Sequence, residues 1–174
     1  MRLLLQGYWK VSIRTITIIA GLLFIILPPA SYGQEWIPYG TGPVMEGRPG
    51  EWDQQVLSSC ILDEGDTLKM WYTGDEEAEV RHTAIGYAWS LDGLEWTPRR
   101  DPVLEGQYND LWMPCVVYDS VTAQYKMWMT GDYALMGYAT SPDGVNWSSP
   151  TPISAPTPVG GWDDGGMLWG NVIK

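Results

Sequence analysis

The chain contains one pattern twice, and this internal repeat limits its possible folds more than any other feature of the sequence. The segment KMWYTG at 69–74 returns as KMWMTG at 126–131, an offset of 57 residues. The segment GYAWSLDG at 86–93 returns as GYATSPDG at 137–144, an offset of 51 residues, and a tryptophan follows each copy. A period of about fifty residues is typical of propellers and other repeat architectures, in which each copy is one supersecondary unit.

Each copy of the repeat has the pattern of four antiparallel strands joined by turns. Apolar and polar residues alternate in the second strand, where Leu68, Met70 and Tyr72 share one face. An Asp-Gly pair, which tolerates the positive φ of a tight turn, joins the third strand to the fourth. Four such strands make one propeller blade. The predicted strands are 56–62, 67–73, 84–90 and 94–98 in the first copy, and 112–118, 124–130, 135–141 and 145–148 in the second.

Parts of further copies flank the two complete ones. The region around Trp36 matches the end of a repeat, which predicts a closing strand ahead of the first blade. Residues 171–173 match 59–61 and 114–116, which predicts the first strand of a third blade. Known propellers have at least about four blades. The sequence therefore predicts an all-β, incomplete propeller domain over residues 34–174, a truncated piece of a larger protein.

The first 33 residues have the composition of a secretory signal peptide. Arg2, Lys10 and Arg14 are its basic residues, the run 16–27 is almost wholly apolar, and small residues end at Gly33. The alternative, a membrane anchor, needs about 20 apolar residues, and this run is shorter. We therefore expect residues 1–33 to be removed, no stable membrane span to remain, and the protein to be secreted or periplasmic.

The chain after residue 33 is strongly acidic. It carries 7 basic and 21 acidic side chains, a formal charge of −14 (7 − 21). Because this charge repels a phosphate backbone, nucleic acid is not expected as a partner. Cys60 and Cys115 occupy matching places in the two copies. A disulfide between them is one possibility in an exported protein, but equivalent positions on adjacent repeats are commonly too far apart, so two buried thiols are favoured.

The repeated motifs resemble those of the five-bladed β-propeller glycosidase superfamily, which includes arabinanases, β-xylosidases, invertases, levansucrases and the related mannoside phosphorylases. The resemblance covers about 36–174 and rests on the two KMW strands, the two Ser-x-Asp-Gly-x-x-Trp segments, and the Pro-Val-Leu and Trp-Asp linkers. It implies a five-bladed propeller that acts on poly- or oligosaccharide. The Ser-x-Asp-Gly-x-x-Trp segment is also similar to the Asp-box turn of sialidases, with one residue fewer between Asp and Gly, and in either family this turn is architectural.

Three aspartates are candidates for catalysis. Glycoside hydrolysis uses two carboxyl groups that flank the scissile bond, and in the resembled enzymes the acids lie where inner strands begin, around the axial funnel. Asp53, Asp110 and Asp163 match these places. The alternative is structural, because a residue repeated in every blade more often serves the fold. No Asp or Glu begins 56–62 or 112–118, where the base and the pKa-modulating acid of these hydrolases are expected, so enzyme activity is left open.

Three tryptophans are candidates for stacking on sugar rings, since tryptophan has an apolar face and a polar edge. They are Trp89, Trp112 and Trp169, and the alternative is that each packs within its sheet. Arg81 and His82 are candidates for binding sugar hydroxyls, with a packing role as the alternative for His82.

No metal ion or other cofactor is expected. The acidic loop with Glu76, Glu77 and Glu79 could bind Ca²⁺, but it lacks an EF-hand pattern, and an exposed acidic loop is usually only solvated. The sequence thus favours an exported, glycosidase-like propeller that acts on or binds poly- or oligosaccharide, and that is inactive as a fragment alone. A non-catalytic propeller that binds glycan or protein is the alternative, because fold does not fix function.

Overall fold

The computed structural model describes the chain as β-strands and connecting turns. The described residues are 18–19, 22–23, 37, 40–76, 82–106, 110–131, 135–153, 160–161 and 170–173. The chain divides into two compact units, Met1–Thr41 and Gly42–Lys174. In the first unit, β1 (Ile18–Ile19) pairs with β2 (Leu22–Leu23). Within the described ranges, no helix is long and apolar enough to cross a membrane.

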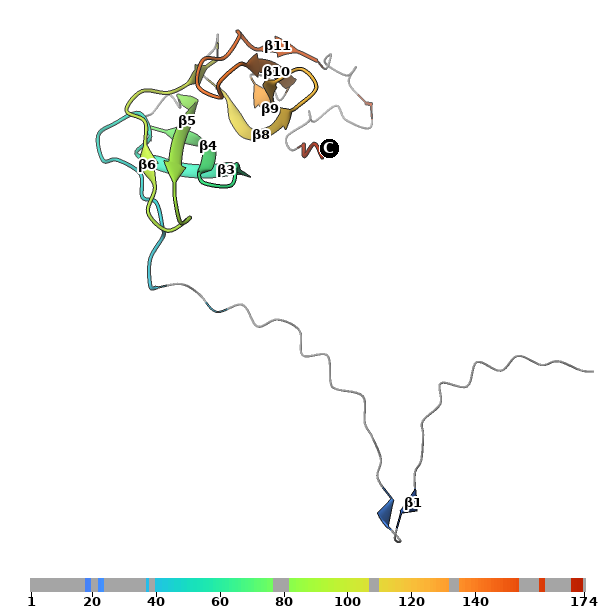
Figure 1. The fold of residues 1–174 in the computed structure, drawn as a ribbon. Coiled ribbons are helices and arrows are strands. Elements are labelled where there is room, and N and C mark those ends of the chain that lie inside the picture. The colour runs from blue at the N-terminus through green and yellow to red at the C-terminus, as the bar shows by residue number, and fades with distance from the viewer. Residues whose placement is uncertain are drawn as a thin grey trace, which may run out of the picture. The chain divides into compact units, whose positions relative to one another are not determined.

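The second unit contains two antiparallel sheets, one from each copy of the repeat (Figure 1). The first sheet, blade 1, has the order β3-β4-β5-β6, and β7 also pairs with β5. The second sheet, blade 2, has the order β11-β10-β9-β8. The strands of blade 1 are β3 (Gln55–Asp63), β4 (Leu68–Asp75), β5 (Thr83–Ser90), β6 (Thr97–Pro98) and β7 (Leu104–Glu105). The strands of blade 2 are β8 (Trp112–Asp119), β9 (Gln124–Gly131), β10 (Leu135–Ser141) and β11 (Thr151–Pro152).

The two blades pack face to face around one shared core. Trp71 and Ile85 of blade 1 are fully buried, and they pack in the same cluster as Met127 and Met129 of blade 2. The inner strands β3 and β8 are in contact, so neighbouring sheets meet at their first strands, as blades do around a propeller axis. The predicted alternation in the second strand is confirmed, because Trp71 faces this core while its neighbour Tyr72 belongs to a separate cluster on the other face of blade 1.

The predicted strands are largely confirmed, but the fourth strand of each blade is shorter and begins later than expected. Only 97–98 pairs with β5, rather than 94–98, and 151–152 pairs with β10, rather than 145–148. The reason is the turn. Asp92 Oδ1 accepts hydrogen bonds from the backbone N–H groups of Leu94 and Glu95 at 2.8 and 3.0 Å, which keeps the chain in the turn past the Asp-Gly pair.

This turn is built in the same way in both blades. Ser90 Oγ accepts the backbone N–H of Gly93 at 2.9 Å, and Ser141 Oγ accepts that of Gly144 at 2.8 Å. The indole N–H of the tryptophan that ends each turn donates to the carbonyl of its glycine at 3.0 Å. Backbone N–H groups directed at the Asp143 carboxylate lower the pKa of that group. The turn that the sequence resembled is thus held in both blades by a local hydrogen-bond network within the blade itself.

The two cysteines are free and lie between neighbouring elements of the propeller. The N–H of Val116 donates to Cys60 Sγ at 3.1 Å, and the N–H of Val172 donates to Cys115 Sγ at 3.2 Å. These equivalent contacts align Val172 with Val116, so Asn171, rather than Val172, takes the cysteine position. The closing strand predicted around Trp36 lies outside the described residues.

Candidate functional site

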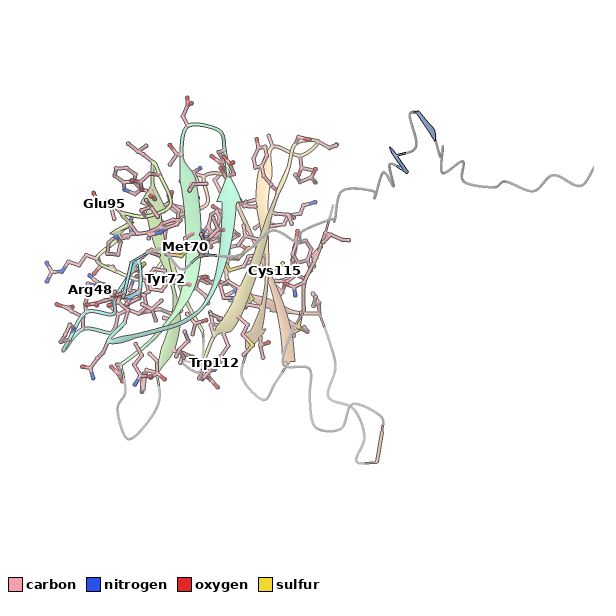
Figure 2. The ribbon with its side chains drawn as sticks, turned by 90° about the horizontal axis from the view of Figure 1, so that it is seen from below. Arg48, Met70, Tyr72, Glu95, Trp112 and Cys115 are labelled. Atoms are coloured by element: carbon pink, nitrogen blue, oxygen red, sulfur yellow. The ribbon has the colours of Figure 1, made fainter. Side chains whose placement is uncertain are left out.

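The candidate site lies at the end of the two sheets where the inner strands β3 and β8 begin. At this end Asp75, the last residue of β4, is paired in register with Gln55 and Thr83. Thr83 in turn forms an isolated parallel bridge with Asp110, which stands two residues before β8. Trp112 begins β8 and is labelled at this end of the sheets in Figure 2. The chain therefore brings two carboxylates, a threonine and a tryptophan to one edge.

Asp110 is held by both neighbouring segments. Thr83 Oγ1 donates to Asp110 Oδ1 at 2.9 Å, and the indole N–H of Trp112 donates to the same oxygen. The N–H of Leu111 donates to the carbonyl of Thr83 at 3.1 Å, which fixes the linker against β5. Asp110 is only partly buried, so its carboxylate is positioned by protein groups and still accessible at the edge.

Asp53 has a different environment. Its carboxylate has no solvent exposure, and Arg48 Nε donates to its two oxygens at 2.8 and 3.0 Å. The hydroxyl of Tyr72 donates to Oδ2 at 2.8 Å. Burial opposes the charge on Arg48, but the hydrogen bond and the charge of Asp53 outweigh it and raise the pKa of the guanidinium. These contacts pair a buried carboxylate with a partly exposed guanidinium and tie 48–53 to Tyr72 of β4.

The two aspartates therefore do not occupy equivalent places, although the sequence pattern matched them. Cys60 and Cys115 pair with Trp71 and Trp128, which fixes the structural alignment of the blades. In this alignment Asp110 corresponds to Gln55, two residues after Asp53. Their roles in catalysis remain predictions, and only Asp110 is within the edge described above.

The structure separates the other predicted binding residues. His82 is exposed and directly precedes β5, at the same end as Asp110. Trp89 is 41% exposed, but it pairs with Lys69 and Thr97 at the far end of β5, so it does not join Trp112. Arg81, Asp163 and Trp169 lie outside the described residues.

Two residues at this edge were not singled out from the sequence. Asp75 reads as the first acid of an exposed loop, yet it is the last residue of β4 and fully buried. Thr83, also buried, holds Asp110. A strand that ends two residues later than predicted moves Asp75 from the loop into the sheet, and nothing in the local pattern signals that shift.

Two hollows are lined by described residues of both blades. One, of about 270 Å³, is lined by residues of β3, of β8 and of the segment 170–173, with Ser59, Pro114 and Gly170 in matching places. The larger, about 810 Å³, lies at the opposite end of the sheets from Asp110 and is lined by Lys69, Glu64 and other residues of both blades. The segment 170–173 lies beside β8, but it is not the strand that the sequence predicted there. The smaller hollow therefore lies on the side of the two blades where β3 and β8 meet.

The polar groups of the larger hollow satisfy one another. Lys69 Nζ lies 2.8 Å from Glu64 Oε2 and donates to the hydroxyl of Tyr125 at 2.6 Å, and this hydroxyl donates to Glu64 Oε1. Burial opposes the charge on Glu64, but these two donors outweigh it and lower the pKa of the carboxyl. No cluster of three or more metal-binding side chains occurs among the residues that the structure describes.

No protein-family model matches the sequence, and no curated protein matches it. Solved structures do match the fold. A glycosyl hydrolase from Bacteroides ovatus is 17% identical, with 71% of this chain and 42% of that chain covered and a TM-score of 0.58. A structure of the GH130 family, described with mannoside phosphorylases and with glycoside hydrolases that target β-1,2 mannosidic linkages in Candida mannan, gives 18% identity, 73% and 43% coverage and a TM-score of 0.60.

An α-L-arabinofuranosidase from Podospora anserina, solved in complex with cellotriose, is 16% identical, with 64% and 36% coverage and a TM-score of 0.52. The chain spans 36–43% of the length of these three structures. At such identities the likeness concerns the fold. It confirms the predicted fold class, an all-β, partial propeller, which is the fold that these solved glycoside hydrolase structures share.

Proposed function

We propose that the chain is part of an exported, carbohydrate-active propeller that binds poly- or oligosaccharide at the edge formed by Asp110, Trp112 and the smaller hollow. The observation that carries the proposal is the held but accessible carboxylate of Asp110 beside an indole at the start of an inner strand. A carboxylate accepts hydrogen bonds from sugar hydroxyls, and an indole face stacks on a sugar ring. Carbohydrate-active neighbours with the same fold support this assignment.

Hydrolysis would need a second carboxyl across the scissile bond from Asp110. Asp53 is enclosed by Arg48 and Tyr72 and has no exposure, so it cannot reach a substrate without local opening. This observation favours the second candidate, a glycan-binding propeller without hydrolytic activity, for the chain as it stands. The first candidate function is glycoside hydrolysis, and under it the partner acid for Asp110 comes from another part of a longer propeller.

The test is binding of the full chain to arabinan, xylan and mannan, with Trp112→Ala as the variant and Trp89→Ala as the matched control. Trp112→Ala should weaken binding by about tenfold, the value of one good aromatic contact. Trp89→Ala, at the other end of the sheet, should leave binding unchanged. Equal losses, or a loss in the control alone, would remove the site from this edge.

Release of reducing sugar from the same three polymers separates the two candidates. Activity that disappears in Asp110→Asn would establish hydrolysis and place Asp110 in it. Binding without release would establish the binding module. Activity that persists in Asp110→Asn would exclude this carboxyl as a catalytic group.

A further inference from the structure

The strand that carries Trp112 has an unusual backbone conformation directly after this residue. Met113 has a φ of 55°, in the left-handed region that residues with a side chain rarely adopt. It lies in an irregular part of β8, where the pairing with β9 shifts between Trp112 and Cys115. Bulges of this kind change the direction in which a side chain points, and they are frequent beside active sites. A strained residue next to a proposed contact residue therefore points to a functional role.

The conformation of Met113 is not part of the repeat. Cys60 and Cys115 align the two blades, so Ser58 of β3 is the counterpart of Met113. The pairing of β3 with β4 also shifts in this region, yet Ser58 has no positive φ. A feature that serves the fold of every blade recurs in each of them. The left-handed conformation at Met113 thus serves something that is particular to blade 2.

A buried hydroxyl of blade 1 holds this conformation. The N–H of Met113 donates to Thr73 Oγ1 at 3.0 Å, which joins β4 of blade 1 directly to β8 of blade 2. Thr73 is fully buried, and its oxygen lies 2.8 Å from Ser58 Oγ. Because a buried N–H group that loses its acceptor is costly, this bond opposes relaxation of Met113 to a negative φ.

The same bond also fixes Trp112, because the N–H of Met113 belongs to the peptide group that follows Trp112. Trp112 is then held at three points. Its backbone pairs with Thr130, its indole donates to Asp110, and the next peptide group donates to Thr73. A side chain that is already ordered in the free protein loses less entropy when a ligand binds, so a fixed indole is a better stacking surface than a mobile one.

We propose that Thr73 is a positioning residue for the glycan site, and that its hydroxyl holds Met113 in the left-handed conformation that directs Trp112 to the edge beside Asp110. This inference rests on the proposed function, since it treats Trp112 as a stacking surface for a sugar ring. Thr73 has no solvent exposure and does not touch the glycan. Its hydroxyl acts on the ligand only through the backbone of β8.

Thr73→Val and Thr73→Ser test the role of the hydroxyl, because valine lacks the acceptor and serine keeps it. For whichever of arabinan, xylan and mannan the full chain binds, Thr73→Val should weaken binding about three- to tenfold, up to the loss expected on removal of the indole. Thr73→Ser should stay within about twofold of the native chain. Thr122→Val is the control and should not change binding, since it removes a hydroxyl that donates to Asp119 at the other end of β8.

Hydrogen exchange of the indole N–H groups separates positioning from a general loss of stability. In NMR spectra of the isotope-labelled full chain, the indole signal of Trp112 is the one that Trp112→Phe removes. Thr73→Val should speed exchange of this indole at least about threefold, whereas the indole of Trp147, which donates to the carbonyl of Gly144, should exchange as in the native chain. Equal acceleration of both indoles would mean that Thr73 supports only the fold, and would overturn the proposal.

Glycine at the strained position provides a second test. Glycine adopts a positive φ without steric cost, so Met113→Gly, added to Thr73→Val, should slow exchange of the Trp112 indole again and regain affinity at least about twofold. Ala123→Gly in the same background is the control and should do neither. Among the residues that the structure describes, Ala123 is the other non-glycine residue with a positive φ, 51°, and it lies in the turn at the far end of β8.

The two kinds of measurement distinguish failure of the site from failure of the positioning role. If the chain binds none of the three polymers, the proposed function is wrong, and exchange of the Trp112 indole alone decides whether Thr73 positions this residue. If the chain binds glycan but Thr73→Val changes neither affinity nor the exchange of this indole, the positioning role is wrong while the proposed function stands. Failure of Met113→Gly to restore either quantity would also overturn the role given to the left-handed conformation.

Discussion

Asp53 is buried with two partners, and a buried carboxylate is costly unless it is paired and hydrogen-bonded. Burial, followed by the hydrogen bond and charge of Asp53, raises the pKa of Tyr72 above its usual range, so its hydroxyl keeps the proton that it donates. We predict that Tyr72→Phe lowers the free energy of unfolding by about 1–3 kcal/mol, since it leaves the buried acid one donor short. Urea denaturation at pH 7 measures the change.

Tyr87→Phe is the matched control for Tyr72→Phe, because it removes the hydroxyl of a neighbouring tyrosine in the same blade. The ring of Tyr87 packs on Trp71, and among the described residues its hydroxyl has no hydrogen-bond partner. This substitution should therefore cost less than about 0.5 kcal/mol. If both substitutions lower the free energy of unfolding by the same amount, the packing of the Tyr72 ring, rather than its hydrogen bond to Asp53, determines the stability of this site.

At the scale of elements, the two Ser-x-Asp-Gly-x-x-Trp turns hold the third strand of each blade to the chain that follows. Backbone N–H groups of Asn146 and Val145 lower the pKa of Asp143 below its unfolded value. A lowered pKa stabilises the fold above the unfolded pKa, about 3.9 for aspartate, and this stability is lost as the pH falls through the folded pKa. We predict that Asp143→Asn is less stable than the native chain at pH 7, and that the difference shrinks below about pH 4.

Urea midpoints between pH 7 and pH 3 give this pH dependence. Asp66→Asn, at an exposed position outside both turns, is the control and should shift the midpoint little at any pH. A constant difference between Asp143→Asn and the native chain across the range would mean that the ionised carboxylate does not hold the turn.

The strands were predictable from the sequence because their residues alternate and recur, whereas their ends depend on contacts across the fold. In each blade, the first and second strands begin and end within two residues of the predicted positions. The fourth strands could not be placed, because a side-chain network at Asp92 and Asp143 decides where the turn ends. Asp53 and Asp110 each stand two residues before an inner strand, as the sequence match expected, whereas the strand pairing at Cys60 and Cys115 aligns Asp110 with Gln55.

At the scale of the whole second unit, we expect the two blades to unfold together, because they share one hydrophobic core. Gly144 lies at the centre of this contact, since its carbonyl accepts both Trp71 and Trp147. Its φ is 82°, and a Cβ at this position would lie 2.8 Å from Cζ2 of Trp71. Gly65 has a similar φ of 87° but has no atom within 4 Å of an added Cβ.

We predict that Gly144→Ala lowers the free energy of unfolding by about 2–4 kcal/mol, of which about 1–2 kcal/mol is the positive φ and the rest the overlap with Trp71. Gly65→Ala should lower the free energy of unfolding only by the about 1–2 kcal/mol that belongs to the positive φ. Amide hydrogen exchange then reports on cooperativity, because destabilising one shared core should speed exchange in β4 and β5 as much as in β9 and β10. Faster exchange in blade 2 alone would show that the blades are independent folding units, and that the contact through Trp71 joins them without making them one.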